Sequence, residues 1–531
     1  MTWRVVVADK VARSGLDLLA ATPEVEVVAV AGKPRADLEH ALAGAHALIV
    51  RSETRVTADL LACAPNLRVV ARAGTGVDTI DVHAATRRGI AVMNAPGANT
   101  VSAGEHAMGL LLALVRRIPE AATAMRQGEW DRKRFEGTEL RGKTIGVVGL
   151  GRIGGHVAQL ARAFGMHVVA HDPYLLPERA AELQVRLLPL DDLLRTADVV
   201  TLHVALTDET RHLINAERLR LMKPTAVLIN TARGELVDDA ALAEAVRAKR
   251  IGGAAIDVFA VEPLPADSPL RGLDRVLLTP HLAASTAEAQ ERVAVEICVA
   301  VRDALLAGDL SFAINVPGIG GDALRRLTPL LDLARRLGRL ALALADGPIT
   351  RVEVAYGGRD EVAPRPVLMS ALEGLLAAMD AGPVSLVNAQ VLAEEKGIQL
   401  ARKTGAPEPG FETSVGVKVD TPRGRVRVAG ALVGNSHGRV VRIDDYHVDV
   451  APDGWMLVIR NRDVPGVIGR VGTVLGGAGI NIASYHQARR ATPGDNALAA
   501  INVDQALTNG VLEELQRLPD VLQVRLAFFG D

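Results

Sequence analysis

The sequence predicts an α/β protein in which two parallel-sheet units are followed by two smaller α+β units. Strand-like and helix-like segments alternate over the first 96 residues. A glycine motif at 149–154 then opens a second alternating series, and residues 451–531 follow the order strand, helix, strand, strand, helix, strand. A chain of 531 residues is also too long for one hydrophobic core, so about three or four domains are expected.

The composition predicts a globular protein of the cytoplasm. Hydrophobic residues make up 49% and charged residues 23%, and no apolar run is long enough to cross a bilayer. The formal net charge of −2 argues against nucleic acid or an anionic membrane as a partner, so an anionic ligand would need local arginines. Cys63 and Cys298 are too few for a disulfide framework or a cysteine-rich zinc site. The N-terminus shows no signal-peptide pattern.

The first 96 residues predict one parallel sheet with crossover helices. Its strand candidates are the apolar runs "WRVVVADK", "EVEVVAV", "ALIVRS" and "LRVVARAG", with helix-like segments between them. One long helix is expected next, at about 101–127. A helix at about 285–307 leads into a segment ending near residue 316 that can complete this first unit. The second unit is therefore expected to be an insertion in the first.

The glycine motif of the second unit predicts a dinucleotide site. Gly149, Gly151 and Gly154 fit G-x-G-x-x-G between a strand and a helix. The first glycine permits a tight turn, the second lets backbone N–H groups approach a pyrophosphate, and the third lets the helix pack on the sheet. Asp172 ends the next strand, where a carboxylate accepts hydrogen bonds from the ribose of NAD and repels the extra phosphate of NADP.

Four domains are expected from these boundaries. Residues 1–96 and 285–316 form the first, and 97–284 form the inserted dinucleotide domain. Residues 317–450 form an α+β domain with a helix pair at about 323–344 and a helix at about 382–396. The order βαββαβ over 451–531 predicts a ferredoxin-like domain.

Four polar residues follow apolar runs of the second unit, namely Arg233, Asp257, Glu262 and His281. Because the carboxyl ends of parallel strands line the ligand crevice, these side chains are expected to converge. The arginine would bind a carboxylate, and His281 would exchange the proton of a hydroxyl while hydride moves at the same carbon. Glu262 would hold the imidazole. Each residue alone also suits an ordinary salt bridge, loop or helix cap.

A metal site is not predicted. His167 and His171 are four residues apart, but they lie in a strand, where this spacing lacks the helical geometry of a metal-binding pair. The sequence likewise contains no Walker motif, no nucleophile elbow and no basic–aromatic patch for nucleic acid.

The segments "VGLGRIG", "HDP", "TARG", "DVFAVEP" and "PHLAAST" resemble the NAD-dependent D-2-hydroxyacid dehydrogenase family. The resemblance covers residues 1–316, and residues 317–531 resemble the intervening and ACT domains of its long members. It implies two Rossmann-like α/β domains, with the substrate domain interrupted by the NAD domain, followed by an α+β intervening domain and a ferredoxin-like ACT domain.

The segments "VRSET", "ARAGTGVDTID" and "NAPGANTVSAGEHA" resemble the family members that act on 3-phosphoglycerate. The resemblance implies NAD-dependent oxidation of its 2-hydroxyl to 3-phosphohydroxypyruvate, the first step of serine synthesis. A reductase for glyoxylate or hydroxypyruvate shares the Arg–Glu–His set and is the alternative enzyme, although the two C-terminal domains argue against it. Formate dehydrogenases of this fold carry glutamine in place of Glu262. A non-catalytic NAD sensor acting through protein contacts is the alternative from another class.

The resemblance also implies roles for individual residues. It makes Arg233, Glu262 and His281 catalytic and assigns Arg51, Arg72 and Asn99 to the substrate. It assigns to the cofactor Thr75, Gly149, Gly151, Arg152, Ile153, Gly154, Asp172, Val204, Ala205, Thr231, Ala232, Asp257 and the segment from His281 to Ala284. Two positions depart from the family. Val204 lacks a hydroxyl, which leaves only its backbone for a contact, and Ala283 stands where glycine is usual.

Regulation and assembly are expected in two further places. The basic stretch Arg132, Lys133 and Arg134 either supplies phosphate contacts across a dimer or is a solvated surface run. In the ACT-like region, Asn461, Asp463 and Asn481 match positions that bind the inhibitor serine, or this region only dimerises. A homodimer or homotetramer is expected.

Overall fold

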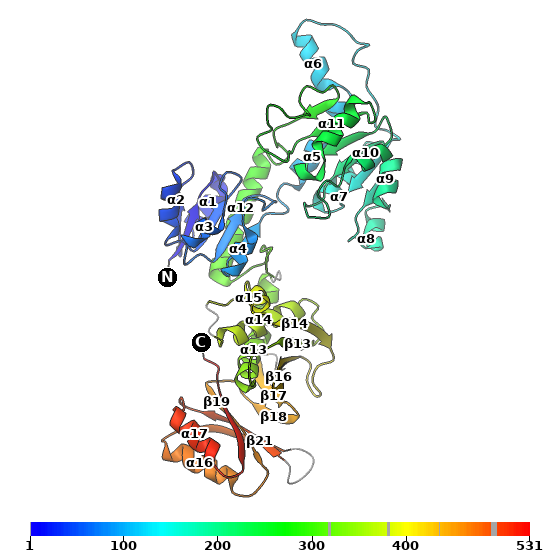
Figure 1. The fold of residues 1–531 in the computed structure, drawn as a ribbon. Helices are drawn as coiled ribbons and strands as arrows, with labels where there is room; N and C mark the ends of the chain where they lie inside the picture. Colours follow the sequence, from blue (N-terminus) through cyan, green and yellow to red (C-terminus); the bar gives the residue numbers. More distant parts are fainter. Residues whose placement is uncertain (1, 317–319, 380–382, 435, 490–495, 531) are drawn as a thin grey trace.

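The structure is a computed structural model that describes residues 2–316, 320–379, 383–434, 436–489 and 496–530. Over these residues the chain forms four β-sheets of five, seven, six and four strands. Figure 1 shows them in separate lobes: the first sheet lies beside the second, and the other two follow below the first. Within the described ranges, no helix is both long and apolar enough to cross a membrane.

The first sheet is fully parallel and has the order β2-β1-β3-β4-β5. Buried valine, leucine and isoleucine fill its strands, as expected for a sheet covered on both faces. The strands are β1 (Trp3–Val7), β2 (Val25–Ala29), β3 (Ala47–Val50), β4 (Val69–Arg72) and β5 (Ala91–Asn94). The helices between them are α1 (Arg13–Ala20), α2 (Arg35–Leu42), α3 (Ala58–Ala62) and α4 (Val82–Arg87).

Helix α12 (Ala287–Ala307) returns to this first sheet after the second unit. It packs against α1 so closely that a Cβ at Gly15 would clash with the backbone of Ala294. The segment after α12 then lies beside β5, where the Ile314 N–H donates to Val92 O at 2.8 Å. Residues far apart in the sequence therefore share one hydrophobic core.

The second sheet is also parallel and has the order β12-β11-β10-β9-β6-β7-β8. Its strands are β6 (Thr144–Val148), β7 (His167–His171), β8 (Arg186–Leu187), β9 (Val199–Leu202), β10 (Val227–Asn230), β11 (Gly253–Ile256) and β12 (Val276–Leu278). Its helices include α7 (Arg152–Ala163), α8 (Pro177–Glu182), α9 (Leu190–Thr196), α10 (Ala216–Leu221) and α11 (Asp239–Arg247). The strand order reverses beside β6, so the glycine motif lies at the point where such sheets bind ligands.

The prediction of a single helix at about 101–127 is wrong. The segment forms α5 (Thr100–Val115), which packs on α7, and a separate α6 (Ile118–Arg126). Arg117 between them adopts the left-handed conformation, with φ of 54°, and the new helix begins at Ile118 with Pro119 in its first turn. In Figure 1, α6 and the segment after it project from the top of the second lobe.

The third domain surrounds a six-stranded sheet of order β14-β13-β15-β16-β17-β18. Its strands are β13 (Arg351–Gly357), β14 (Gln399–Gly405), β15 (Ser414–Thr421), β16 (Gly424–Val433), β17 (His437–Ile443) and β18 (Tyr446–Val450). The helix pair expected at 323–344 is instead one helix, α13 (Gly321–Leu344), which continues through Pro329 because its leucines are buried against the sheet. Helix α14 (Pro364–Ala377) was not expected, and within the described residues α15 begins only at Ala389 and ends at Glu395.

The last domain has the predicted ferredoxin-like βαββαβ fold. Its sheet order is β20-β21-β19-β22, from β19 (Trp455–Arg462), β20 (Ile482–Arg489), β21 (Asn496–Val503) and β22 (Val521–Phe528). Helices α16 (Val467–Gly477) and α17 (Asn509–Arg517) cover one face with their own core. The other face contributes Met456, Val458 and Leu498 to the core of the third domain.

Candidate active site

The glycine loop between β6 and α7 is shaped for a dinucleotide. Gly149 has φ of 89°, and a Cβ there would lie 2.7 Å from His203 O. Gly151 faces open space, which leaves room for a ligand to approach the backbone. A Cβ at Gly154 would clash with Gly149 O, so this glycine allows the helix to pack on the loop. The N-terminus of α7 therefore remains accessible to a pyrophosphate.

Asp172 stands beside this loop at the end of β7. One carboxylate oxygen accepts from the Leu150 N–H at 2.9 Å, and the other accepts from the Tyr174 N–H at 3.0 Å. After β10, which is separated from β7 by β6 and β9, the buried Thr231 hydroxyl has no hydrogen-bond partner among the described residues. An oriented carboxylate, an unpaired buried hydroxyl and an open glycine turn fit the ribose and phosphate groups of NAD.

His281 and Glu262 form a pair on the exposed edge of the second sheet. Nδ1 of His281 lies 2.9 Å from Oε2 and 3.1 Å from Oε1 of Glu262, and Oε1 also accepts from the Phe259 N–H at 3.0 Å. The side chains are 49% and 38% exposed, so a ligand can reach them. With Nδ1 directed at the carboxylate, Nε2 of His281 remains available for proton transfer.

Asp257 does not face the crevice, in contrast to the expected convergence of all four residues. It is completely buried, and its carboxylate lies within 3.1 Å of His106 Nε2, Thr279 Oγ1 and the N–H groups of Leu282 and Ala283. Burial alone would raise the pKa of Asp257, but the hydrogen bonds from these donors outweigh it and lower that pKa. The residue anchors the loop that carries His281.

Arg233 reaches from the end of β10 to the first sheet. Its Nε lies 3.0 Å from Asp78 Oδ2, and its Nη1 donates to Ala232 O at 2.6 Å. The guanidinium lies against Gly76, where a Cβ would clash with Nη2. Arg233, Asp78 and Gly76 therefore form a contact between the two α/β domains.

Arg72 of the first domain lies close to both Arg233 and Arg51. Nε of Arg72 donates to Arg51 O at 3.0 Å, and its Nη1 donates to Gly76 O. Burial lowers the pKa of Arg72, and the positive charges of Arg233 and Arg51 lower it further. A guanidinium group repelled by two others favours a ligand with more than one negative charge.

The other predicted contacts lie on segments that follow strands or begin helices of the two α/β domains. Thr75 Oγ1 donates to Asn99 Oδ1 at 2.7 Å, at the start of α5 where the chain passes from the first domain to the second. Ala283 O accepts from the Ser102 hydroxyl at 2.8 Å. Arg152 and Ile153 begin α7, Val204 and Ala205 follow β9, Ala232 precedes Arg233, and Ala284 follows the His281 loop.

The basic stretch lies away from this crevice, on the projecting segment after α6 (Figure 1). Arg134 pairs with Glu129 at 2.8 Å, and Asp131 accepts from the N–H groups of Lys133 and Arg134. Arg132 is exposed. Within one chain, the stretch does not join Arg51, Arg72 and Arg233.

The residues expected to bind serine lie at two places in the ACT-like domain. Asn461, at the end of β19, is 2% exposed, and its Oδ1 has no partner in the part of the chain that the structure describes. Asp463 lies two residues later, and its Oδ1 is 3.3 Å from Nε of Arg489. Asn481 instead donates to Asp504 at 2.6 Å.

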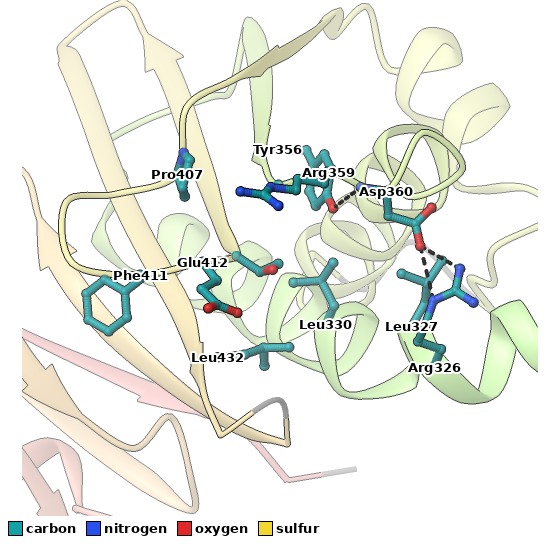
Figure 2. A pocket seen from close by; sticks show the side chains of 12 residues that line it. Arg326, Leu327, Leu330, Tyr356, Arg359, Asp360, Pro407, Phe411, Glu412 and Leu432 are labelled. Atoms are coloured by element: carbon teal, nitrogen blue, oxygen red, sulfur yellow. Dashed lines mark hydrogen bonds and ion pairs between the residues drawn. The ribbon is translucent and has the colours of Figure 1, made fainter.

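A cavity of about 650 Å³ lies elsewhere, between α13 and two loops of the third domain (Figure 2). Arg326 pairs there with Asp360, whose N–H donates to the hydroxyl of Tyr356. It contains none of the residues expected to act in catalysis.

Four residues that contact the predicted site residues were not identified from the sequence, namely Asp9, Asp78, Ser102 and His106. Asp9 carries the same signal that identified Arg233, because a polar residue directly follows the buried strand "WRVVVA". The other three lie in loops or helices, where the sequence pattern gives no such signal.

Three segments of the chain match known families. Residues 108–283 match the NAD binding domain of D-isomer specific 2-hydroxyacid dehydrogenases, and 326–444 match the D-3-phosphoglycerate dehydrogenase intervening domain. Residues 455–520 match the ACT domain. The cofactor of the second domain is therefore NAD.

Solved structures share the dehydrogenase part of the fold. An NAD-dependent formate dehydrogenase of Staphylococcus aureus in complex with NAD matches 58% of this chain and 96% of its own, with 30% identity and a TM-score of 0.52. A protein of Thermus thermophilus matches 57% of this chain and 97% of its own, with 41% identity and a TM-score of 0.52.

Relatives of known name match over nearly the full length. A D-3-phosphoglycerate dehydrogenase of Synechocystis is 41% identical over 98% of this chain and 93% of its own. Those of Mycobacterium leprae and Bacillus subtilis are 44% and 38% identical, over 96% and 99% of both chains. With the three matched domains in the same chain, this similarity shows that the protein belongs to the D-3-phosphoglycerate dehydrogenase family.

Proposed function

We propose that the chain oxidises the 2-hydroxyl of 3-phosphoglycerate to 3-phosphohydroxypyruvate, the first step of L-serine biosynthesis. The observation that carries this proposal is the placement of Arg72 of the first domain beside Arg233, which follows a strand of the same sheet as the His281–Glu262 pair. This arrangement offers a proton acceptor together with cations for a ligand that has two anionic ends. The full-length relatives named D-3-phosphoglycerate dehydrogenase support the choice of substrate.

NAD, when bound, accepts the hydride from the carbon that carries the hydroxyl. The N-terminus of α7 and the glycine loop would hold its pyrophosphate, Asp172 its ribose hydroxyls, and Thr231 one of its polar groups. Asp257 acts indirectly, because its buried carboxylate fixes the backbone of Leu282 and Ala283 beside this site.

His281 is the general base of the proposed reaction. Its Nε2 takes the proton of the 2-hydroxyl as the hydride leaves the same carbon, so the alcohol loses one proton and one hydride and becomes a ketone. Glu262 accepts the hydrogen bond from Nδ1–H, which fixes the ring and stabilises the imidazolium that forms.

The arginines position the two anionic ends of the substrate. Arg233 keeps Nη2 available, because Nε is held by Asp78 and Nη1 by a backbone carbonyl, and it binds the carboxylate and polarises the developing carbonyl. Arg51 and Arg72, on the opposite side of the crevice, bind the phosphate. This division places hydride and proton transfer between the two domains.

The projecting α6 segment pairs two chains in the proposed homodimer, and two dimers can associate in a tetramer. Trp130 on this segment is 77% exposed, and Met125 is 54% exposed, which a partner surface would cover. Pairing brings Arg132, Lys133 and Arg134 towards the substrate site of the partner subunit. A monomer in solution would make the stretch a solvated surface run.

The ACT domain binds serine and lowers activity in this proposal. The buried, unpaired Oδ1 of Asn461 supports a ligand there, and Asp463 next to it can accept the ligand ammonium once Arg489 moves aside. Asn481 precedes β20, whose opposite end carries Arg489, so it would complete the site from the partner subunit. Cytoplasmic location stays a prediction.

Turnover separates the proposed function from its alternatives. Purified protein with NAD and 3-phosphoglycerate is expected to form NADH. Activity only with glyoxylate or hydroxypyruvate and NADH would favour the reductase, and NAD binding without turnover of either would favour the sensor.

Serine inhibition is tested in the same assay. Serine should inhibit the wild type, and Asp463→Ala should relieve this inhibition without changing activity in the absence of serine. Glu513→Ala, which removes an exposed carboxylate of α17, is the matched control and should remain inhibited. Unchanged inhibition of Asp463→Ala would remove Asp463 from the serine site.

A further inference from the structure

We propose that Asp9 is the positioning residue that holds Arg51 in place for the phosphate end of the substrate. This inference rests on the proposed function, because it assigns the distal anion to Arg51. Asp9 lies at the carboxyl end of β1, next to β3, whose end carries Arg51. It touches neither the catalytic pair nor the cofactor loop.

Within the part of the chain that the structure describes, the Asp9 carboxylate makes its hydrogen bonds to the loop after β3. Oδ2 accepts from the N–H groups of Arg51, Glu53 and Thr54 at 2.6, 3.3 and 3.2 Å, and Oδ1 accepts from the Thr54 hydroxyl at 2.5 Å. The residue is only 2% exposed, so water does not compete for these donors. A buried carboxylate with four donors is a strong anchor, because charged acceptors bind N–H groups more tightly than neutral ones.

The backbone of Arg51 is fixed on both sides. Asp9 holds its N–H, and Arg72 Nε donates to its carbonyl oxygen at 3.0 Å. The loop therefore has little freedom to move Arg51 away from Arg72, although the two positively charged guanidinium groups repel one another. Without Asp9, this repulsion would favour displacement of the Arg51 side chain towards solvent.

The charge of Asp9 also acts on this arginine cluster. Burial and the charges of Arg233 and Arg51 lower the pKa of Arg72, while the carboxylates of Asp78 and Asp9 oppose this effect. Of these two carboxylates, Asp78 is engaged by Arg233 and exposed, whereas Asp9 is buried. Asp9 therefore supplies negative charge that does not compete for the ligand.

The test compares Asp9→Ala, Asp9→Asn and the wild type with two substrates. Asp9→Ala removes every acceptor and should raise the KM for 3-phosphoglycerate about tenfold or more, with kcat changed less than about threefold. Asp9→Asn keeps one oxygen for the three N–H groups, and its amide can donate to the Thr54 hydroxyl, but it loses the negative charge, so this variant should raise the KM clearly less than Asp9→Ala, by about threefold.

D-Glycerate, which lacks the phosphate, is the substrate control. Its kcat/KM should be the same for Asp9→Ala and wild type, because Arg51 has no anion to bind in either case. Glu53→Gln, which changes a carboxylate of the same loop but leaves its N–H bonded to Asp9, is the matched control and should match wild type with both substrates. If Asp9→Ala does not fold, Asp9→Ser replaces it, since a serine hydroxyl is too short to reach the whole loop.

A double-mutant cycle with Arg51→Ala decides whether Asp9 acts through Arg51. On that background, Asp9→Ala should raise the KM for 3-phosphoglycerate by less than about twofold. The proposal would be overturned if the effects of Asp9→Ala and Arg51→Ala on KM multiplied as independent effects do. It would also be overturned if Asp9→Ala lowered kcat/KM for D-glycerate as much as for 3-phosphoglycerate. Calorimetric binding of 3-phosphoglycerate to the same variants separates the role of Asp9 from the proposed function of the chain. It reports on Asp9 even if the wild type does not turn over 3-phosphoglycerate.

Discussion

Nε of Arg233 lies 3.0 Å from Oδ2 of Asp78, although the two residues are 155 positions apart and belong to different sheets. Arg233 follows β10 of the second sheet, and Asp78 lies in the loop after β4 of the first. The carboxylate holds one edge of the guanidinium and leaves Nη2 directed at Gly76. The proposed carboxylate-binding arginine is therefore oriented by a residue of the other domain.

Asp78→Asn should lower kcat/KM for 3-phosphoglycerate about three- to tenfold, because Arg233 loses its charged partner and samples other rotamers. The affinity for NAD should not change. Asp78 is 58% exposed, so the thermal unfolding temperature should also stay close to wild type. Steady-state kinetics and fluorescence titration with NAD check these outcomes. A rise in kcat/KM would show instead that Asp78 competes with the substrate for Arg233.

His281→Ala should lower kcat about 10²- to 10⁴-fold, because the proton of the 2-hydroxyl loses its acceptor. Glu262→Gln should lose less, since its amide can still accept from Nδ1–H but stabilises the imidazolium poorly. NADH formation in the steady state measures both effects, with calorimetry for NAD. A loss of NAD affinity as large as the loss of kcat would contradict a role in proton transfer.

Asp172→Asn should raise the KM for NAD about tenfold and improve the ratio of NADP to NAD activity. The asparagine oxygen can still accept from the Leu150 N–H, so the glycine loop keeps its shape while the negative charge is lost. The weaker repulsion of the NADP phosphate then accounts for the changed ratio. Kinetics with both cofactors provide the measurement, and an unchanged ratio would place the ribose of NAD away from Asp172.

His203 should make the fold less stable in acid. Burial lowers the pKa of His203 from 6.5 to about 4, so between these values the unfolded chain binds a proton that the folded chain does not. The stability that His203 contributes is therefore fully present above the unfolded pKa and is lost as the pH falls towards the folded pKa. The free energy of unfolding should fall by about 1–3 kcal/mol over this window, a range that allows for the partial exposure of the ring. Urea unfolding at several pH values in this window measures the slope.

The variant His203→Asn should flatten this slope, since it removes the titrating group. His83→Asn, on the exposed side of α4, is the control and should keep the wild-type slope. A slope in the His203 variant equal to that of wild type would assign the acid sensitivity to other groups.

The local pattern of the sequence was sufficient for the parallel sheets, the glycine turn and the ferredoxin-like domain. Alternation of apolar runs with amphipathic segments depends on neighbouring residues, and so does the need for glycine at 149. The same reasoning failed for 101–127 and 323–344. The left-handed backbone of Arg117 ends the first predicted helix early. In the second segment, burial of the leucines stabilises one continuous helix that includes Pro329.

The pattern of the sequence did not predict whether each polar side chain is buried or exposed, or which residues it contacts. Asp257 and Glu262 both follow β11 in the sequence, yet one is completely buried below the loop and the other is exposed beside His281. Their roles differ because packing of α5 places His106 against Asp257.

The sequence alone thus determined the parallel sheets, the ferredoxin-like domain and which residue types stand at the ends of the strands, because propensity and periodicity act over a few residues. Tertiary structure alone decided that Asp78 meets Arg233 and that Asp9 anchors the loop of Arg51. These contacts join segments 42 to 155 residues apart, and only the packing of sheets and helices brings such segments within hydrogen-bond distance.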